Sequence, residues 1–387
     1  MTDIALVDGA RTPHGELLGA LSGQSAVDLG TAAIDGLLDR TGIARDRVDW
    51  VGFGNAIQAG VGQVPARQAV VRSGLPNATA VTTVNEASGS GVRAIALAAD
   101  RIAAGETDFA VAGGMESMSN APYLLPDYRQ GRRHGDGEIV DAMVRDGLWD
   151  MNYGGHMGEI TEDMVAREGI DREVIDEYAL RSHRHAADAI EDGRFDAETV
   201  AVETRTGLVE RDEGPRPESS LESLGALPTP FREDGVITPG NASKLADGAG
   251  AVLLADADAA HEQGFGVMAH LVDYATAYRA PDEFNEAVGD VIEELLARND
   301  LTVEDVDHYE VNEAFAAQTV YVRDRLGIPQ DALNPNGGAV AFGHPIGASG
   351  GMLATSLAYG MEREDATYGL VGMSVGGGGA IMALFER

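Results

Sequence analysis

Two short glycine-rich stretches hold residues that could act on an acyl group. NEASGSG (85–91) places Ser88 directly before the small apolar run VRAIALAADRIAAG, which predicts Ser88 in the first turn of a helix. Free backbone N–H groups and the helix dipole stabilise negative charge there, so a nucleophile would be activated. The same position also suits a serine that only caps the helix.

GGAVAFGHPIGASG (337–350) places His344 between Gly343 and Pro345, where small and rigid neighbours would hold the ring. A serine hydroxyl needs an adjacent general base, and His344 is the candidate base for Ser88. NEAFA (312–316) and GMSVGGGGA (372–380) add Asn312, Ser374 and Gly376. Taken singly, Asn312 is also typical of a turn and Gly376 of a hairpin.

The composition narrows the class of protein. The 387 residues include 28 basic and 63 acidic side chains, a net charge of −35, and no cysteine. The absence of cysteine excludes disulfides and thiolate sites, and the acidity argues against nucleic acid and anionic membranes as partners. Self-repulsion of this size is screened when the Debye length falls to about 3 Å at ~1 M salt. We therefore expect a protein of a salt-rich cytoplasm, the alternative being an acidic protein of ordinary salt.

The sequence lacks the patterns of a membrane span, a signal peptide and a metal site. No run approaches the ~20 apolar residues that span a bilayer, and MTDIALVDGARTP has no signal-peptide pattern. We expect a cytoplasmic protein. No group of carboxylates or histidines has metal-ligand spacing, so no metal site is expected.

The chain contains an internal duplication. VDW at 48, SGSG at 88 and DFAVAGG at 108 recur in the same order as VDHYE at 306, GASG at 347 and TYGLVGM at 367. The helices expected at 91–104 and 349–361 carry small, mostly apolar residues on every side, which indicates burial on more than one face. This pattern predicts a helical layer sandwiched between two sheets, with close backbone contacts.

A segment of different composition lies between the repeats. Residues 118–245 are rich in turns, with one amphipathic helix expected near 171–192. We interpret it as an inserted loop domain that carries binding surface. The predicted organisation is an N-terminal half at 1–117, the insertion at 118–245, a return to the N-terminal half at 246–260, and a C-terminal half at 261–387.

Together these motifs resemble the thiolases, enzymes that act on acyl-CoA thioesters. The resemblance covers nearly the whole chain and includes ALVDGARTPHGELLGAL at 5, GGMESMSNAPY at 113, HMG at 156 and GNASKLADGAGA at 240. It implies a duplicated, five-layered α/β/α/β/α thiolase fold with an inserted loop domain. This expectation agrees with the repeat and with the two buried helices.

The resemblance also implies roles for single residues. Ser88 stands where thiolases have the cysteine that is acylated, and His344 matches the histidine that activates it. His344 also matches a residue that helps hold the thioester oxygen, and Asn312 matches the asparagine that positions a water in that same oxyanion hole. Gly376 matches the donor that forms a second oxyanion hole together with the Ser88 N–H. Ser374 stands where the family has a second cysteine, the acid and base for the α-carbon. Residues matching the pantetheine channel are His156, Met157 and Ser243.

Serine at both cysteine positions resembles a haloarchaeal type of thiolase, although an engineered cysteine-free sequence would look the same. Three α-carbon bases stay open: Ser374, or His344 serving both steps, or His156. Lys244 is a candidate phosphate contact or a solvent-facing lysine. Arginines that could bind the CoA phosphates are Arg132, Arg133, Arg205, Arg211, Arg216 and Arg232.

The leading functional hypothesis is a transferase that condenses two acetyl-CoA, or acetyl-CoA and a short acyl-CoA, to a 3-ketoacyl-CoA through acyl-Ser88. The product would serve polyhydroxyalkanoate or isoprenoid synthesis. No tightly bound cofactor is expected, because coenzyme A thioesters are the substrates. Two alternatives are a non-catalytic CoA-binding subunit and a serine-dependent acyl-CoA hydrolase. By resemblance we expect a homodimer or homotetramer, with or without a small companion subunit.

Overall fold

The framework of the protein is one hydrogen-bonded β-sheet path with two parts. The computed structural model describes residues 3–387. The N-terminal part has the strand order β1-β12-β5-β3-β4, with bounds Ile4–Arg11, Ala246–Asp256, Phe109–Ser117, Trp50–Gly54 and Ala80–Val84. The C-terminal part has the order β13-β16-β15-β14, with bounds Ala269–Tyr278, Gly379–Glu386, Tyr368–Val375 and His308–Val311.

The two parts join through β1 and β13. Only two residue pairs make this connection, Ala5 with His270 and Leu6 with Ala269. The two separate sheets expected from the sequence therefore share a short ladder at one edge. Because that ladder is so short, the remainder of each part can face the other across a layer of helices.

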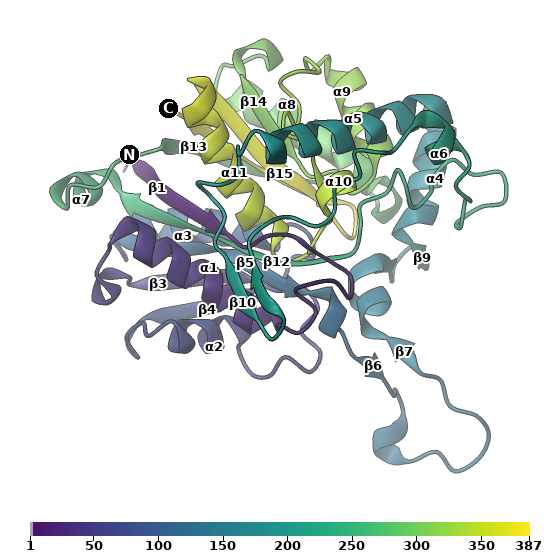
Figure 1. Ribbon diagram of the computed structural model, residues 1–387, viewed down its shortest axis with the longest axis horizontal. Helices are drawn as coiled ribbons and strands as arrows, with labels where there is room; N and C mark the ends of the chain where they lie inside the picture. Colours follow the sequence, from purple (N-terminus) through teal and green to yellow (C-terminus); the bar gives the residue numbers. More distant parts are fainter. Residues whose placement is uncertain (1–2) are drawn as a thin grey trace.

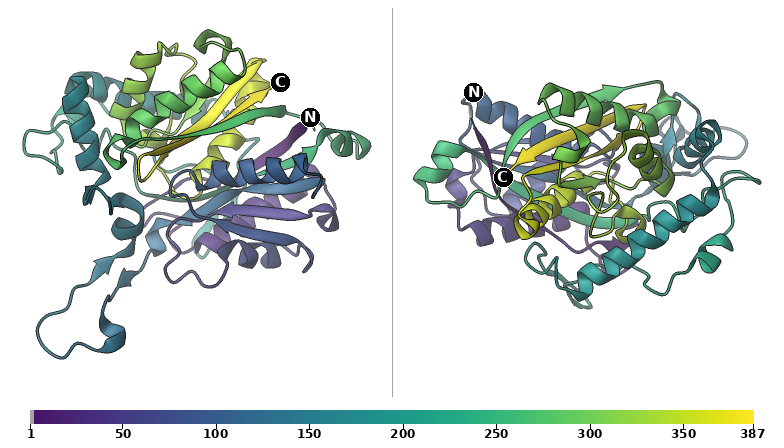
Figure 2. Two further views of the ribbon diagram at one scale, coloured as in Figure 1. Left: turned by 180° about the vertical axis from the view of Figure 1, so that it is seen from behind. Right: turned by 90° about the horizontal axis from the view of Figure 1, so that it is seen from above.

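Helices separate and cover the two parts of the sheet, as Figures 1 and 2 show. α3 (Ser90–Ala103) and α11 (Ser349–Glu364) form the middle layer, and their apolar side chains pack in one cluster with residues of both parts. α1 (Ala26–Thr41) and α2 (Pro65–Arg72) pack on the outer face of the N-terminal part. α8 (Phe284–Arg298) and α9 (Ala316–Leu326) do the same for the C-terminal part. The five-layered α/β/α/β/α fold is confirmed.

The middle layer depends on glycine. A Cβ atom on Gly91 of α3 would lie 2.7 Å from the backbone nitrogen of Gly351 and 2.8 Å from Cα of Gly350, both in α11. No side chain fits at that distance, so only glycine allows the two helices to meet. The contact lies at the first turns of both helices, and it brings together the segments that precede them.

The region 118–245 packs against the layers from outside. It contains the amphipathic helix predicted near 171–192, observed as α5, which contacts α9. Its β6–β7 hairpin extends as a long arm from the body of the molecule (Figure 1). The elements of this region are β6 (Tyr123–Leu124), β7 (Val140–Asp141), β8 (Trp149–Asp150), β9 (Gly155–His156), α4 (Met157–Glu168), α5 (Arg172–Glu191), β10 (Val202–Thr204), β11 (Gly207–Val209) and α6 (Leu221–Gly225).

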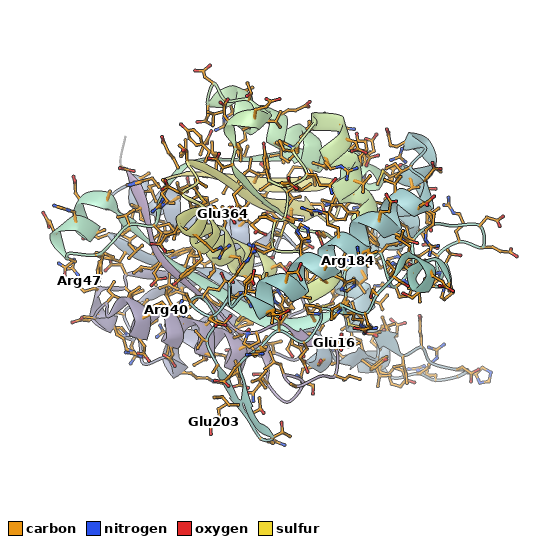
Figure 3. All side chains as sticks on the ribbon, turned by 45° about the horizontal axis from the view of Figure 1, so that its top comes forward. Glu16, Arg40, Arg47, Arg184, Glu203 and Glu364 are labelled. Atoms are coloured by element: carbon orange, nitrogen blue, oxygen red, sulfur yellow. The ribbon has the colours of Figure 1, made fainter. Side chains whose placement is uncertain are left out.

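Three short elements complete the fold: β2 (Gly15–Glu16), α7 (Ala257–Glu262) and α10 (Ala339–Phe342). Charged side chains are spread over the surface, for example Glu203 on the β10–β11 hairpin and Glu364 at the end of α11 (Figure 3). Across residues 3–387, no helix has both the length and the apolarity needed to cross a membrane.

Arg11 is a buried cation that ties the N-terminal part to the inserted region. Its side chain is 1% exposed. Its Nε donates to Glu198 at 2.5 Å, and its two terminal nitrogens donate to Asp212 at 2.8 and 3.0 Å. Burial disfavours the charge, but the two carboxylates more than compensate and raise the pKa of Arg11. The cluster is satisfied only while all three charges are present.

We predict that Arg11→Ala lowers the free energy of unfolding by about 3–5 kcal/mol, because it leaves two buried carboxylates without their cation. Urea unfolding in molar KCl measures this loss. The control is Arg298→Ala, since Arg298 is 47% exposed in its pair with Asp273 and should cost less than about 1 kcal/mol. Equal losses in the two variants would contradict a structural role for the Arg11 cluster.

Candidate active site

Ser88 lies on a turn just before α3, not in its first turn as the sequence predicted. The helix begins at Ser90 with Gly89 as its N-cap, and no side chain caps it. The difference arises at Ala87, whose φ of 47° lies in the left-handed region and turns the chain before the helix starts. Ser88 is therefore not the helix cap, and its hydroxyl is directed into a cavity.

Hydrogen bonds of neighbouring residues hold this turn. The Ser90 hydroxyl accepts from the N–H of Glu86 at 2.9 Å and donates to the carbonyl of Ala87 at 2.6 Å. Arg93 donates twice to the Glu86 carboxylate, at 2.7 and 3.1 Å. A left-handed non-glycine residue costs energy and persists only where its surroundings fix it, as they do here.

The Ser88 hydroxyl and the His344 ring meet across the two halves of the chain. Ser88 Oγ lies 2.8 Å from His344 Nε2, although 256 residues separate them. On the other side of the ring, Nδ1 lies 2.6 Å from Ser349 Oγ, which itself donates to the carbonyl of Pro345 at 3.1 Å. A hydroxyl has one hydrogen, so Ser349 must accept from Nδ1–H. Nε2 is then unprotonated and accepts from Ser88, as a general base requires.

His344 is buried and neutral. The residue is 7% exposed. Burial, and secondarily the charge of His14, lowers the pKa of His344 to about 4. The ring is thus in its basic form at neutral pH, held by the glycine-rich scaffold that the sequence indicated.

The segment at 242–245 connects the loops around the site. The N–H of Ser243 donates to the carbonyl of Ala314 at 3.0 Å, and the N–H of His344 donates to the carbonyl of Lys244 at 2.8 Å. Backbone bonds of this kind are independent of side-chain identity, so they fix the loops even though the residues are small. The GNASKLADG motif therefore acts partly through its backbone.

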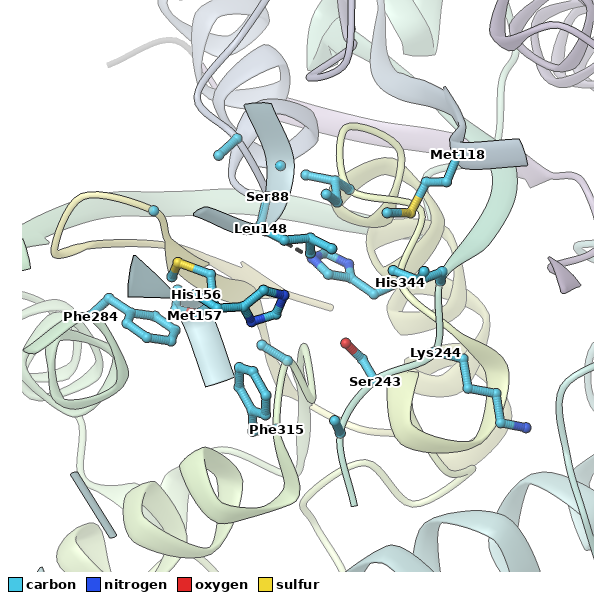
Figure 4. Close-up of a pocket in the computed structure, with 18 of the residues that line it drawn as sticks. Ser88, Met118, Leu148, His156, Met157, Ser243, Lys244, Phe284, Phe315 and His344 are labelled. Atoms are coloured by element: carbon cyan, nitrogen blue, oxygen red, sulfur yellow. Dashed lines mark hydrogen bonds between the residues drawn. The ribbon is translucent and has the colours of Figure 1, made fainter. Parts of the chain in front are cut away.

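Eight of the nine predicted site residues line one cavity of about 320 Å³: Ser88, His156, Met157, Ser243, Lys244, His344, Ser374 and Gly376. Figure 4 shows Ser88 and His344 joined on one side, with His156 and Met157 facing them. The Lys244 side chain points away from the imidazole (Figure 4).

Asn312 is the ninth residue, and it lies in a smaller cavity beside the first, together with Ser349 and Gly343. Asn312 is 2% exposed, and its side-chain Nδ2 has no hydrogen-bond partner among residues 3–387. A buried amide donor without a partner is costly and is usually satisfied by water or a ligand. The geometry leaves this donor available for either.

Ser374 and His156 differ in what they can do. Ser374, at 3% exposure, makes no hydrogen bond through its hydroxyl within the described chain, so no base primes it. His156 caps α4, and its Nδ1 accepts from the N–H of Gly158 at 3.1 Å while its ring packs on Phe231. Burial lowers the pKa of His156, and Glu159 opposes this shift. Its neutral ring therefore carries the proton on Nε2 and is a donor.

An apolar wall that the sequence did not reveal completes the cavity. Its residues come from six separate segments: Met118, Leu148, Phe231, Phe284, Phe315 and Ile346. Met118, Phe315 and Ile346 stand inside the quoted motifs, whereas no local pattern marks the other three. Within residues 3–387, no three ligating side chains gather as a metal would need. The site is a hydrophobic slot with a few polar groups at one end, the form typical of a small-molecule site.

A surface groove continues from this cavity and shares Ser243 and Lys244 with it. Lys244 Nζ bonds the carbonyl of Gly214 and lies 3.5 Å from Glu16. Burial, and secondarily the charge of Arg216, lowers the pKa of Lys244 to about 8. Of the six predicted phosphate-binding arginines, Arg216 is the one that lines the groove, 3.3 Å from Glu16.

Comparisons with known proteins agree with this fold. Residues 4–258 match the family model "Thiolase, N-terminal domain", and residues 265–387 match "Thiolase, C-terminal domain". The chain is 42% identical to the acetyl-CoA acetyltransferase of Escherichia coli K12 and 40% identical to that of Cupriavidus necator, with all of each chain covered.

A solved structure is similar over the same extent. The acetyl-CoA acetyltransferase of Bacillus anthracis superposes with a TM-score of 0.97 at 35% identity, covering 100% of this chain and 99% of that one. Likeness at this level over whole chains shows more than a shared architecture. The chain belongs to the thiolase family.

Proposed function

We propose that the protein is an acyl-CoA C-acyltransferase that condenses two acetyl-CoA, or acetyl-CoA and a short acyl-CoA, to a 3-ketoacyl-CoA through acyl-Ser88. The observation that carries this proposal is the 2.8 Å contact between Ser88 Oγ and the unprotonated Nε2 of His344, inside an apolar cavity. The names of the relatives, acetyl-CoA acetyltransferases, support the choice of substrate.

In the first step, Ser88 Oγ attacks the thioester carbonyl carbon and its proton moves to His344 Nε2. The thiolate of CoA leaves and takes that proton, which regenerates the neutral ring. Negative charge develops on the carbonyl oxygen, and donors already in place stabilise it. We assign this task to the N–H groups of Ser88 and Gly376.

In the second step, a base removes a proton from the α-carbon of the incoming acetyl-CoA, and the carbanion attacks the carbonyl carbon of the Ser88 ester. The new C–C bond forms as the ester C–Oγ bond breaks, and Ser88 Oγ takes the proton back from the base. Ser374 has no partner among residues 3–387 to take its own proton, and the neutral His156 ring is a donor. We therefore assign the role of base to His344 in both steps. Asn312, whose Nδ2 has no partner among residues 3–387, would hold the thioester oxygen of the incoming substrate through a water.

We assign the pantetheine arm to the channel past His156, Met157 and Ser243, and the phosphates to the groove at Arg216 and Lys244. The serines at 88 and 374 would mark a haloarchaeal type of thiolase, acting as a homodimer or homotetramer in a salt-rich cytoplasm. The domain limits 1–117, 118–245, 246–260 and 261–387 remain predictions.

The second candidate function is a serine-dependent acyl-CoA hydrolase. The serine–histidine contact favours it, because an oxoester is attacked by water as in serine hydrolases. Formation of free acid from acetyl-CoA, with no transfer to CoA or to a second acetyl group, would support it. A non-catalytic CoA-binding subunit would bind CoA and catalyse neither acyl transfer nor hydrolysis.

We predict that Ser88→Ala and His344→Ala each lower thiolysis and condensation rates at least ~1,000-fold, because each removes one half of the nucleophile–base pair. Both rates are measured in molar KCl. The control is Ser25→Ala, which removes the N-cap of α1 far from the cavity and should keep nearly full activity. Unchanged turnover in Ser88→Ala would eliminate the acyl-serine.

We predict that the His344 ring titrates near pH 4 in the folded protein, since burial lowers its pKa. NMR of the ring, assigned with His344→Gln, measures the midpoint. The unfolded chain binds this proton near pH 6.5, so it holds more protons than the native state between the two values. The His344 contribution to the free energy of unfolding therefore rises with pH across that window. A midpoint near 6.5 would mean that the ring is solvated.

We predict that Arg216→Ala raises the KM for acetyl-CoA about 10-fold with little change in kcat, because one charged hydrogen bond to phosphate is lost. Steady-state kinetics at fixed KCl measure both constants. Arg205→Ala is the control, since Arg205 lies at the tip of the β10–β11 hairpin. A lower kcat with unchanged KM would show that Arg216 does not bind the phosphates.

A further inference from the structure

Glu116 is a buried carboxylate close to the site that the reaction scheme leaves unused. It is the next-to-last residue of β5, in the GGMES motif, and is 1% exposed. It does not line the cavity, so substrate does not reach it. A carboxylate in a wholly buried strand is retained only where its charge is compensated.

Donors from two loops converge on this carboxylate. One oxygen accepts from the N–H of Ala56 and from that of Gly347, both at 2.9 Å. The other accepts from Asn55 Nδ2 at 2.7 Å and from the N–H of Ile57 at 3.3 Å. Gly347 belongs to the His344 loop of the C-terminal half, whereas residues 55–57 follow β3 of the N-terminal half.

The network continues to Ser88. The carbonyl of Ala56 accepts from Asn85 Nδ2 at 3.1 Å, and Asn85 opens the turn that ends at Ser88. A short chain of hydrogen bonds thus runs from the His344 loop through Glu116 to the Ser88 turn. It crosses between the two halves of the molecule where the reacting pair meets.

The N–H donors at this place favour a carboxylate. Burial raises the pKa of Glu116 to about 7, and the N–H donors oppose that rise. A glutamine has one acceptor oxygen, and its NH₂ group would face N–H donors. The packing is equally tight, because a Cβ on Gly347 would lie 2.7 Å from the nitrogen of Ala56 and 2.8 Å from the Glu116 carboxylate.

We propose that Glu116 is a positioning residue that sets the Ser88–His344 distance by holding the two loops together. Its kinetic consequence rests on the proposed acyl-serine function, whereas its geometric consequence does not. A displacement of about 1 Å between reacting groups costs on the order of 100-fold in rate. Loss of the carboxylate should therefore lower reactivity without loss of substrate binding.

The test compares Glu116→Gln with Glu198→Gln, an equally buried carboxylate that bonds Arg11 and Ser356 instead of the two loops. For Glu116→Gln we expect the acylation rate to fall about 100-fold with KM for acetyl-CoA nearly unchanged. Its crystal structure should show Ser88 Oγ and His344 Nε2 more than about 3.5 Å apart. Glu198→Gln should lose thermal stability but keep the wild-type distance and rate.

Two further measurements distinguish a failure of this proposal from a failure of the proposed function. Phosphonylation of Ser88 by an alkyl fluorophosphonate, followed by mass spectrometry, reports the reactive pair without any acyl transfer. If Glu116→Gln does not fold, Asn85→Ala removes a single hydrogen bond of the same network. This variant should slow the phosphonylation about 10-fold. A wild-type distance and reactivity in the folded variants, or equal losses in Glu198→Gln, would overturn the positioning role even if the transferase activity itself is absent.

Discussion

The hydrogen bond between Ser88 and His344 is the contact on which the rest of the structure depends. Its two residues lie 256 positions apart, on loops that precede α3 and α11. Each loop is anchored to its own helix, so the contact exists only because the two helices meet at Gly91, Gly350 and Gly351. The duplicated layers are thus a means of placing two helix starts side by side, and the small residues of the middle layer follow from that need.

The surroundings of the pair decide what it can do. A thiol ionises near pKa 8.5 with little help, but a hydroxyl needs a base held at hydrogen-bonding distance. Here the third member is the Ser349 hydroxyl, which orients the ring but adds no negative charge. Burial also disfavours the imidazolium, as the lowered pKa of His344 shows. Stabilisation of the developing oxyanion must therefore carry more of the reaction than in hydrolases with an aspartate.

The sequence was most informative where function demands unusual residues. The resemblance that the glycine-rich motifs carry implied one site for Ser88, His344, Ser374 and Gly376, which line one cavity, and the apolar helices predicted the middle layer. The predicted place of Ser88, in the first turn of α3, was wrong. The left-handed conformation of Ala87 cannot be read from its residue type. Phe284 and Leu148 were missed for another reason: single apolar residues reach the cavity only through tertiary packing. Ser349 and Glu116 stood inside quoted motifs, but their partners lie in other loops.

The most direct measurement is rapid-quench mass spectrometry of the wild-type protein mixed with acetyl-CoA in molar KCl, with peptide mapping of the adduct. The account predicts an acetyl group on Ser88 that forms before 3-ketoacyl-CoA appears and disappears on addition of CoA. Product formation with no acetyl group at Ser88, or an acetyl group on another residue, would contradict it.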